Sequence, residues 1–290
     1  MEWLLVALLG LISTVLLACL AAVYWRRRGA FFQTDDVRLH YRDEGEGEVV
    51  LLLHGFAVHS DLNWRHTGVL RRLRRHFRVI TLDLRGHGLS GKPRESAAYG
   101  LELVHDVARL LEHLGIQQAH LVGYSLGGFV ALKTADCHGA RLRSVAVLGA
   151  GWERPDDEAL FQTLAHCGQA LTSGHAIPPL GPAQARPGLV YTWLNRLFTA
   201  LFVDQRALGA LVHSLHDLTL SEERLRALEL PLCAIIGEQD YLRPGAERLI
   251  GRVPALEFHL IRGAGHLSLA WRGEMHQILE DFLRRHGRAT

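Results

Sequence analysis

The sequence contains few of the residues that would tie it to a metal site or a disulfide framework. Its 290 residues include four cysteines, and none lies in a C-x-x-C pair or at the Cys/His spacing of a zinc site. We therefore expect no metal, and we interpret the cysteines as single buried thiols in a reducing compartment. They are Cys19, Cys137, Cys167 and Cys233.

The chain also lacks both common phosphate-binding patterns, G-x-G-x-x-G and the P-loop, so we expect no nucleotide cofactor. The formal net charge is only +2, which gives no indication of a nucleic-acid partner. Lysine is almost absent, with Lys92 and Lys133 the only two. What the chain does have is length enough to bury one large core, as a single α/β domain does.

Residues 3–25 form a long run without a charged side chain. As a helix this run would extend roughly 34 Å, enough to cross the hydrocarbon core of a bilayer. Three arginines, residues 26–28, follow at once, and the positive-inside rule places that side in the cytoplasm. We predict a single-pass anchor over residues 1–28 and a cytoplasmic domain over 29–290. A cleaved signal peptide, or lipidation at Cys19, is the alternative, but a basic start and a short apolar region are absent.

Beyond residue 28, apolar runs alternate with amphipathic segments. This alternation predicts a mostly parallel, doubly wound sheet of about eight strands with helices on both faces. Residues 37–41 alternate apolar and polar side chains and precede a charged turn, which predicts a half-exposed antiparallel edge hairpin. The buried strands are expected at 49–53, 78–82, 119–122, 142–150, 231–237 and 256–261, and the helices at 70–77, 99–114 and 126–136.

Strand patterns disappear over residues 152–228, where helical spacing is interrupted by prolines. One interpretation is a helical insertion that covers only its own core. The number of aromatic side chains favours a cap that lines an apolar substrate pocket. The candidate pocket residues are Tyr124, Trp152, Trp193, Phe198 and Phe202.

The pentapeptide at residues 123–127, Gly-Tyr-Ser-Leu-Gly, lies between an expected strand and an expected helix. Small residues on both sides allow a sharp turn, and the turn projects the Ser125 hydroxyl near a helix N-terminus. A serine hydroxyl needs a base to become a nucleophile, and the base needs an acid to orient it. Asp240 and His266 each follow an expected strand and can supply these groups. Glu153 is an alternative acid.

Five motifs, in this order and each at a strand end, resemble the α/β-hydrolase family over residues 31–286. They are residues 54–56 (His-Gly-Phe), 83–90 (Asp-Leu-Arg-Gly-His-Gly-Leu-Ser), 123–127, 237–240 (Gly-Glu-Gln-Asp) and 263–266 (Gly-Ala-Gly-His). In some members of the family the nucleophile is aspartate, as in epoxide hydrolases and dehalogenases. Here that position is Ser125, which argues against both activities.

The resemblance implies that Ser125 is the nucleophile, His266 the base and Asp240 the acid. It also implies that the backbone N–H groups of Phe56 and Leu126 form the oxyanion hole. His87 matches a loop pattern of the family, which favours a structural role for it, and Asp83 with Arg85 is expected to organise the same loop. The residues expected to support the site are His54, Gly55, Gly123 and Gly127.

These features predict a membrane-anchored serine hydrolase without a cofactor, acting on lipophilic carboxylic esters such as monoacylglycerols or medium-chain acyl esters. A carbon–carbon bond hydrolase and a cofactor-free haloperoxidase would use the same three residues and stay open as alternatives. The basic helix expected at 70–77 has either a solvated face or one that contacts anionic lipid headgroups. From another class, a non-catalytic binding protein with the same fold is the remaining alternative.

Overall fold

The computed structural model describes residues 29–34, 37–175, 199 and 203–287. The predicted anchor over residues 1–28 lies outside this part of the chain, as do the candidate pocket residues Trp193, Phe198 and Phe202. Within the described ranges, every helix is too short or too polar to cross a bilayer.

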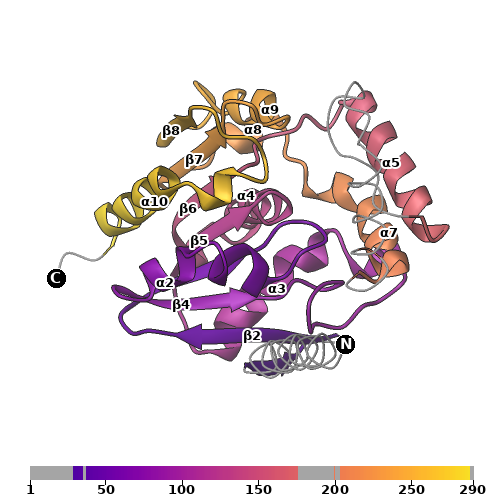
Figure 1. The fold of residues 1–290 in the computed structure, drawn as a ribbon. Coiled ribbons are helices and arrows are strands. Elements are labelled where there is room, and N and C mark those ends of the chain that lie inside the picture. The colour runs from indigo at the N-terminus through magenta and orange to yellow at the C-terminus, as the bar shows by residue number, and fades with distance from the viewer. Residues whose placement is uncertain (1–28, 35–36, 176–198, 200–202, 288–290) are drawn as a thin grey trace, which may run out of the picture.

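An eight-stranded sheet forms the centre of the molecule (Figure 1), and its strands run in the order β1-β2-β4-β3-β5-β6-β7-β8. Every neighbouring pair from β4 to β8 is parallel, so the sheet is mostly parallel, as predicted. The strands are β1 (Ala30–Gln33), β2 (Arg38–Glu44), β3 (Glu48–Leu53), β4 (Phe77–Leu82), β5 (Ala119–Tyr124), β6 (Leu142–Leu148), β7 (Leu232–Gly237) and β8 (Leu256–Ile261).

The antiparallel edge differs from the predicted hairpin. β2 does not pair with β3, the next strand in sequence, but with β1 and β4, both antiparallel. β2 is also more buried than its alternating pattern indicated, because Leu39, His40, Tyr41 and Arg42 are all covered. The charged turn after β2 therefore leads into the interior of the sheet, and the edge belongs to β1.

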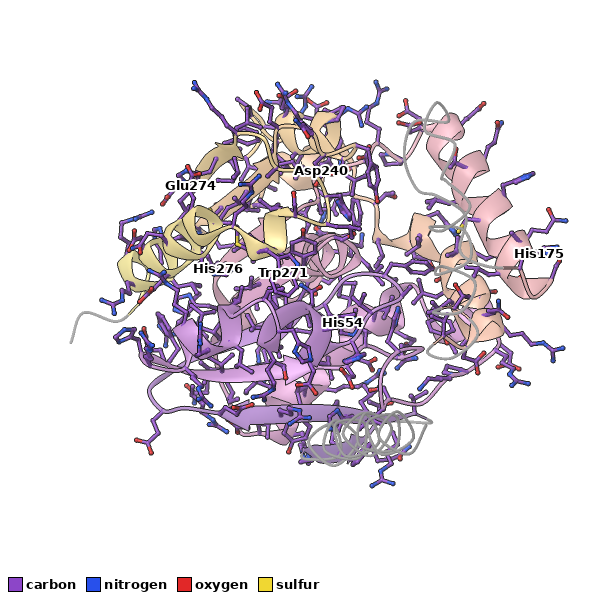
Figure 2. The ribbon with its side chains drawn as sticks, viewed as in Figure 1. His54, His175, Asp240, Trp271, Glu274 and His276 are labelled. Atoms are coloured by element: carbon purple, nitrogen blue, oxygen red, sulfur yellow. The ribbon has the colours of Figure 1, made fainter. Side chains whose placement is uncertain are left out.

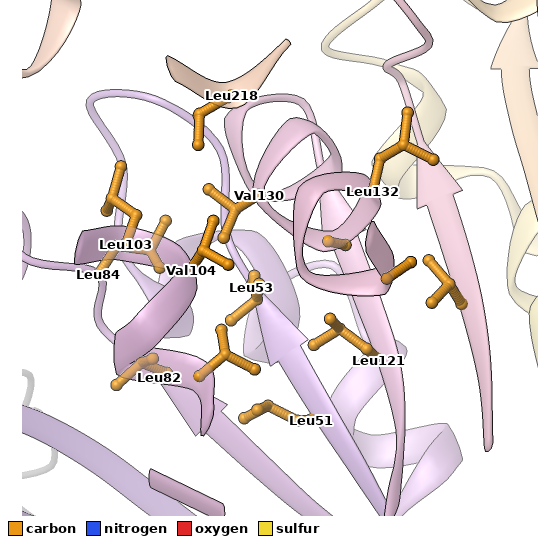
Figure 3. Packing of buried hydrophobic residues seen from close by; sticks show 14 of the residues in the cluster. Leu51, Leu53, Leu82, Leu84, Leu103, Val104, Leu121, Val130, Leu132 and Leu218 are labelled. Atoms are coloured by element: carbon orange, nitrogen blue, oxygen red, sulfur yellow. The ribbon is translucent and has the colours of Figure 1, made fainter. Parts of the chain in front are cut away.

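The strands are apolar on both sides because helices cover both faces of the sheet. In β3, Leu51 and Leu53 face one hydrophobic cluster, while Val50 and Leu52 face the other. All four side chains have no exposed surface. Figure 3 shows Leu51 and Leu53 among the residues of the first cluster, to which α3 (Leu101–His113) and α4 (Leu126–His138) also contribute side chains. Side chains of α2 (Val69–Leu73) and α10 (Gly273–Arg285) cover the second cluster.

Of the three helices predicted outside the cap, α3 and α4 follow the predicted ranges closely and α2 is shorter than expected. α9 and α10 were not predicted as separate elements. The α-helices are α2 (Val69–Leu73), α3 (Leu101–His113), α4 (Leu126–His138), α5 (Glu158–Thr172), α7 (Gln205–His213), α8 (Glu222–Arg226), α9 (Arg243–Glu247) and α10 (Gly273–Arg285). Short turns of helix are η1 (Asp61–Arg65), η2 (Ser96–Ala98), η3 (Gly139–Arg141), η4 (Leu215–Leu218) and η5 (Leu269–Trp271).

The described residues of the insertion between β6 and β7 form helices joined by loops and contain no strand. α5 and α7 pack against each other at one end of the molecule, away from the layers of the sheet (Figure 1). A small cluster of Cys167, Leu171, Leu208 and Val212 holds the two helices together. Of the other cysteines, Cys233 is buried in the sheet, whereas Cys137 is exposed, contrary to the expectation of a buried thiol.

Candidate active site

The turn between β5 and α4 holds Ser125 in a strained backbone conformation. Its φ is +52° and its ψ is −115°, a region that side-chain-bearing residues rarely occupy. The chain reverses so tightly that a Cβ atom on Gly123 would overlap the carbonyl oxygen of Gly127. A Cβ atom on Gly127 would in turn overlap the carbonyl oxygen of Leu53 in β3. Only glycine fits at both positions, and the turn therefore presents the Ser125 hydroxyl beyond the end of the sheet.

Three side chains from distant parts of the chain meet at this turn. His266 Nε2 lies 3.0 Å from Ser125 Oγ, and His266 Nδ1 lies 3.0 Å from each carboxylate oxygen of Asp240. An ionised carboxylate can only accept, so Nδ1 carries the proton and Nε2 is left to accept from the serine hydroxyl. The arrangement can therefore remove the serine proton, as the predicted roles of these residues require.

Backbone and aromatic groups hold the acid and the imidazole. The Leu242 N–H donates to Asp240 Oδ1 at 2.9 Å, and the Asp240 side chain has no exposed surface. The Tyr241 ring lies against the imidazole of His266, with ring centroids 4.8 Å apart. On another side, the Tyr124 hydroxyl donates to the His266 carbonyl oxygen. Burial raises the pKa of both tyrosines, so each stays neutral near pH 7.

The two backbone N–H groups expected to form the oxyanion hole have no acceptor within the described part of the chain. Leu126 is the first residue of α4, so its N–H has no partner inside the helix. Phe56 lies in the loop after β3, and its side chain and Ser125 line the same cavity. Among the described residues, only Ala57 and Ser125 combine a side chain with positive φ, and each adjoins one of the two donors.

The loop that carries Phe56 is fixed by His54, which is labelled in Figure 2. His54 Nδ1 donates to the Gly55 carbonyl oxygen at 2.7 Å, and Nε2 accepts from the Leu84 N–H at 3.0 Å. The Gly55 carbonyl and the Phe56 N–H belong to one rigid peptide group, so this bond orients the N–H as well. Burial lowers the pKa of His54, and the neutral ring keeps both bonds.

His87 holds the next residue of the same loop. Its Nε2 accepts from the Ala57 N–H at 3.1 Å, and its Nδ1 donates to the Arg85 carbonyl oxygen at 3.1 Å. Burial lowers the pKa of His87 to about 3, so the ring is neutral and Nε2 has a lone pair available. Within the described residues, no hydrogen bond joins His87 to Ser125. Its two hydrogen bonds hold the loop, in agreement with the structural role predicted from the sequence.

Asp83 and Arg85 organise the loop after β4. Asp83 accepts from His40 and from the N–H groups of Ser60 and Leu89, each at 2.9 to 3.0 Å. Burial by itself would raise its pKa, but these bonds lower the pKa well below the usual range. Arg85 forms a bidentate salt bridge with the buried Asp106, in which Nε and Nη2 each donate to one carboxylate oxygen at 2.7 Å. Neither residue lines the cavity beside Ser125.

A cavity of about 480 Å³ opens beside Ser125. It is lined by side chains of α4, α5, α7, η4 and α9 and of the loops that follow β3, β6 and β7. Most of its walls are apolar, contributed by side chains such as Phe56, Phe129, Leu218 and Tyr241. Its size and chemistry are those of a small-molecule pocket. Among the described residues, no cluster of three or more His, Cys, Asp or Glu side chains could hold a metal ion.

The cavity agrees only in part with the pocket predicted from the sequence. Trp152 lines it, with its Nε1 donating to the Leu220 carbonyl oxygen at 2.9 Å. Tyr124 does not line it. Instead the Tyr124 side chain is buried between Trp64 and the His266 loop, because residues at the end of β5 alternate between the two faces of the sheet.

Several wall residues carried no recognisable signal in the sequence. Tyr241 could have been found, because it directly follows the predicted acid. Leu164, Cys167, Val212 and Leu215 come from the cap, and their place on the wall depends on how α5 and α7 pack. Burial raises the pKa of the Cys167 thiol to about 11, so this thiol stays protonated.

The alternative acid, Glu153, is engaged elsewhere. Its Oε2 accepts from Arg248 Nη1 at 2.5 Å, and the imidazole of His266 has Asp240 on its Nδ1. Asp240 is labelled in Figure 2, in the loop that follows β7. Of the two candidate acids, Asp240 is therefore the one in contact with His266.

A comparison with protein-family models agrees with the α/β architecture of the chain. Residues 48–166 match the family model described as alpha/beta hydrolase fold. This similarity covers part of the chain, and the eight-stranded sheet with helices on both faces is consistent with it.

Individual relatives differ in chemistry. The chain is 28% identical to 2-hydroxymuconate semialdehyde hydrolase of Pseudomonas putida, over 85% of this chain and 90% of that one. It is 36% identical to mouse epoxide hydrolase 4 over 39% of this chain, but spans only 31% of that protein's length.

Solved structures show the fold over most of the chain. A thermophilic esterase from Thermogutta terrifontis has a TM-score of 0.72 at 24% identity, and the match covers 90% of this chain and all of the esterase. A membrane phospholipase A described as a bacterial virulence factor has a TM-score of 0.70 at 23% identity, with both chains covered completely.

Proposed function

We propose that the protein is a serine hydrolase that cleaves lipophilic carboxylic esters. The observation that carries the proposal is the line of contacts from Asp240 through His266 to Ser125 Oγ, opening into an apolar cavity of about 480 Å³. The hydroxyl and the imidazole meet at 3.0 Å, a distance at which the proton can pass as the oxygen attacks.

The reaction would proceed in two halves. His266 Nε2 takes the Ser125 proton while Oγ attacks the ester carbonyl, and the N–H groups of Phe56 and Leu126 stabilise the oxyanion. The imidazolium, held by Asp240, then protonates the departing alcohol and leaves an acyl-serine. Water, deprotonated by His266, releases the acid and restores Ser125. An oxyanion donor of this kind contributes about 3 to 4 kcal/mol to lowering the barrier.

Because the cavity walls are apolar, they fit an ester with a long acyl chain better than an ester of a small polar acid. We further propose that residues 1–28 anchor the chain in a membrane, where lipophilic esters concentrate. The similarity in fold to a membrane phospholipase A, over the whole length of both chains, supports both proposals. The similarity in fold to an esterase supports the first one.

The experiment is a series of nitrophenyl esters from acetyl to dodecanoyl, together with labelling by a fluorophosphonate probe. We expect a kcat/KM maximum at medium or long chains and labelling on Ser125 only. A sharp maximum at acetyl would overturn the lipophilic substrate, and absence of labelling would overturn the serine mechanism.

A carbon–carbon bond hydrolase is the second candidate. It is favoured by the near full-length similarity to 2-hydroxymuconate semialdehyde hydrolase. The same three residues would serve that reaction, so a ring-cleavage product compared with the ester series separates the two.

A further inference from the structure

One hydroxyl group on the cavity wall has no hydrogen-bond partner among the described residues. The hydroxyl side chains that line the described part of the cavity are Ser125, Thr163, Thr219 and Tyr241. Ser125 is hydrogen-bonded to His266, Thr219 Oγ1 donates to a backbone carbonyl oxygen at 2.8 Å, and Thr163 has an interaction of its own. The hydroxyl of Tyr241 is the one that no described residue engages.

A hydroxyl on the wall of an apolar cavity needs a reason to be there. Tyrosine hydroxyls that are withdrawn from bulk water usually have a hydrogen-bond partner, because an unpaired one is costly. A phenylalanine at position 241 would keep the ring contact with His266 and would avoid this cost. Burial raises the pKa of Tyr241, and the nearby Asp240 carboxylate and Cys167 thiol add to the rise. The hydroxyl therefore keeps its proton near pH 7 and can donate it to a molecule in the cavity.

The position of Tyr241 indicates which part of a substrate it would meet. Its ring lies against the imidazole of His266, with ring centroids 4.8 Å apart. In the proposed reaction this imidazole returns a proton to the departing alcohol, so the alcohol part of the ester lies beside it. The influence of the Cys167 thiol of α5 on Tyr241 shows that the phenol also approaches the cap. The Tyr241 hydroxyl is thus placed next to the alcohol part of the ester, between His266 and the cap.

A donor in this position discriminates between substrates. Water can accept from the hydroxyl before the substrate binds. A substrate that displaces this water must offer an acceptor of its own or lose the hydrogen bond, and a site built to bond a substrate oxygen rejects analogues that lack it. An alcohol part made only of carbon and hydrogen is therefore the poorer substrate.

We propose that Tyr241 is a specificity-determining residue whose hydroxyl donates a hydrogen bond to an oxygen atom in the alcohol part of the substrate. This inference rests on the proposed function and narrows it. The substrate is then an ester of an alcohol that carries a further ether, hydroxyl or carbonyl oxygen, and not a simple alkyl ester.

A matched pair of esters tests the proposal. In 2-methoxyethyl hexanoate and butyl hexanoate the acyl chain is the same, and the alcohol parts differ by one oxygen in place of one CH₂ group. We would measure kcat/KM for both esters with the full-length wild type and the Tyr241→Phe variant by titrating the hexanoic acid that is released. We expect the ratio of the two kcat/KM values, methoxyethyl over butyl, to fall about 10-fold in Tyr241→Phe. Comparing the ratio between the two proteins cancels the intrinsic difference in reactivity between the esters.

Tyr99→Phe is the matched control, because it removes a hydroxyl that donates to the Pro93 carbonyl oxygen at 2.6 Å and does not line the cavity. The ratio should keep its wild-type value in this variant. Urea unfolding gives a second readout. Tyr99→Phe should lower the urea midpoint because a hydrogen bond is lost, whereas Tyr241→Phe should not lower it, since its hydroxyl has no bond within the described residues to lose.

Three results would overturn the role of Tyr241. They are an unchanged ratio in Tyr241→Phe, an equal fall of kcat/KM for both esters, and a lower urea midpoint. An equal fall would show that the hydroxyl acts on the imidazole of His266, and a lower midpoint would show that it is bonded within the protein.

The two proposals can fail separately. If the wild type cleaves both esters and the ratio does not depend on Tyr241, only the role of Tyr241 is wrong. If the wild type cleaves neither ester, we would measure the binding of both uncleaved esters to the same two proteins by calorimetry. Tighter binding of the methoxyethyl ester that Tyr241→Phe removes would then leave only the ester reaction wrong, and equal binding of both esters would overturn the role of Tyr241 as well.

Discussion

The sheet and the cap differ in how much apolar surface each of them buries within itself. The strands are covered on both faces by two extensive clusters, and β3, β5 and β7 are buried along nearly their whole length. The described cap helices α5 and α7 share a cluster of four buried side chains. The sheet can therefore fix distances at Ser125, whereas the cap supplies wall surface that tolerates rearrangement. Under the proposed function, the reacting side chains therefore lie in the first region, and the residues that select the substrate lie in the second.

Replacing Ser125 with alanine should have the largest effect. The nucleophile comes from the rigid region, and loss of such a residue typically lowers kcat about 10⁴- to 10⁶-fold. The fold should be retained, because the strain at Ser125 comes from the turn and not from its hydroxyl. We would compare kcat for a nitrophenyl ester and the urea midpoint of the two proteins. Near-normal turnover with an intact fold would contradict the assignment.

The acid is tested by comparing Asp240→Asn with Glu153→Gln. An asparagine at 240 no longer stabilises the imidazolium and favours the wrong tautomer of His266, so kcat should fall about 10⁴-fold. Glu153 contacts Arg248 and not His266, so Glu153→Gln should leave kcat for a nitrophenyl ester within about threefold of the wild-type value. A comparable loss of kcat in the two variants would contradict the assignment of the acid to Asp240 and of Glu153 to the cavity wall.

The sheet core should be far less tolerant than the cap. Leu52 is fully buried in the centre of the sheet, and Leu52→Ala should lower the free energy of unfolding by about 2 to 5 kcal/mol. Urea unfolding followed by circular dichroism measures this loss. The surface substitution Glu274→Gln serves as the control and should change the value by less than about 0.5 kcal/mol. A loss of that small size for Leu52→Ala would mean that the core is loosely packed.

The sheet and the three converging residues could be predicted because their signals are local. β3, β5 and β7 are short apolar runs, and Ser125, Asp240 and His266 each follow a strand end in a recognisable motif. Parallel strands place those ends at one edge of the sheet, so order along the chain was enough. What failed depends on distant packing. The turn after residue 43 resembles a hairpin, but β2 pairs with β4, and nothing local distinguishes the two outcomes. Likewise, the contact between Glu153 and Arg248 joins residues 95 positions apart and left no pattern.

The buried His87, which accepts from the Ala57 N–H in the loop after β3, gives the rigid region a pH dependence. The pKa of His87 is about 3 in the folded protein, whereas an unfolded chain has the ordinary value near 6.5. Between these values the unfolded state binds one more proton, so stability is complete above pH 6.5 and falls as the pH decreases. The expected slope is about 1.4 kcal/mol per pH unit. His87→Gln keeps an acceptor for the Ala57 N–H and should lose about 2 kcal/mol less than the wild type between pH 8 and pH 5. Parallel curves from urea unfolding at both pH values would contradict the neutral, buried ring.

The smallest effect on stability is expected in the cap. Leu171 is buried between α5 and α7 but does not line the cavity. Leu171→Ala should lower the free energy of unfolding by less than about 2 kcal/mol, because a small cluster can close over the space that is left. Since the triad lies in the other region, kcat for an acetyl ester should not change. KM for a dodecanoyl ester should rise, because the cap wall that contacts a long chain is displaced. A fall in kcat for both esters would show instead that the cap helps to hold the geometry at Ser125, and the separation of chemistry from substrate choice would then be lost.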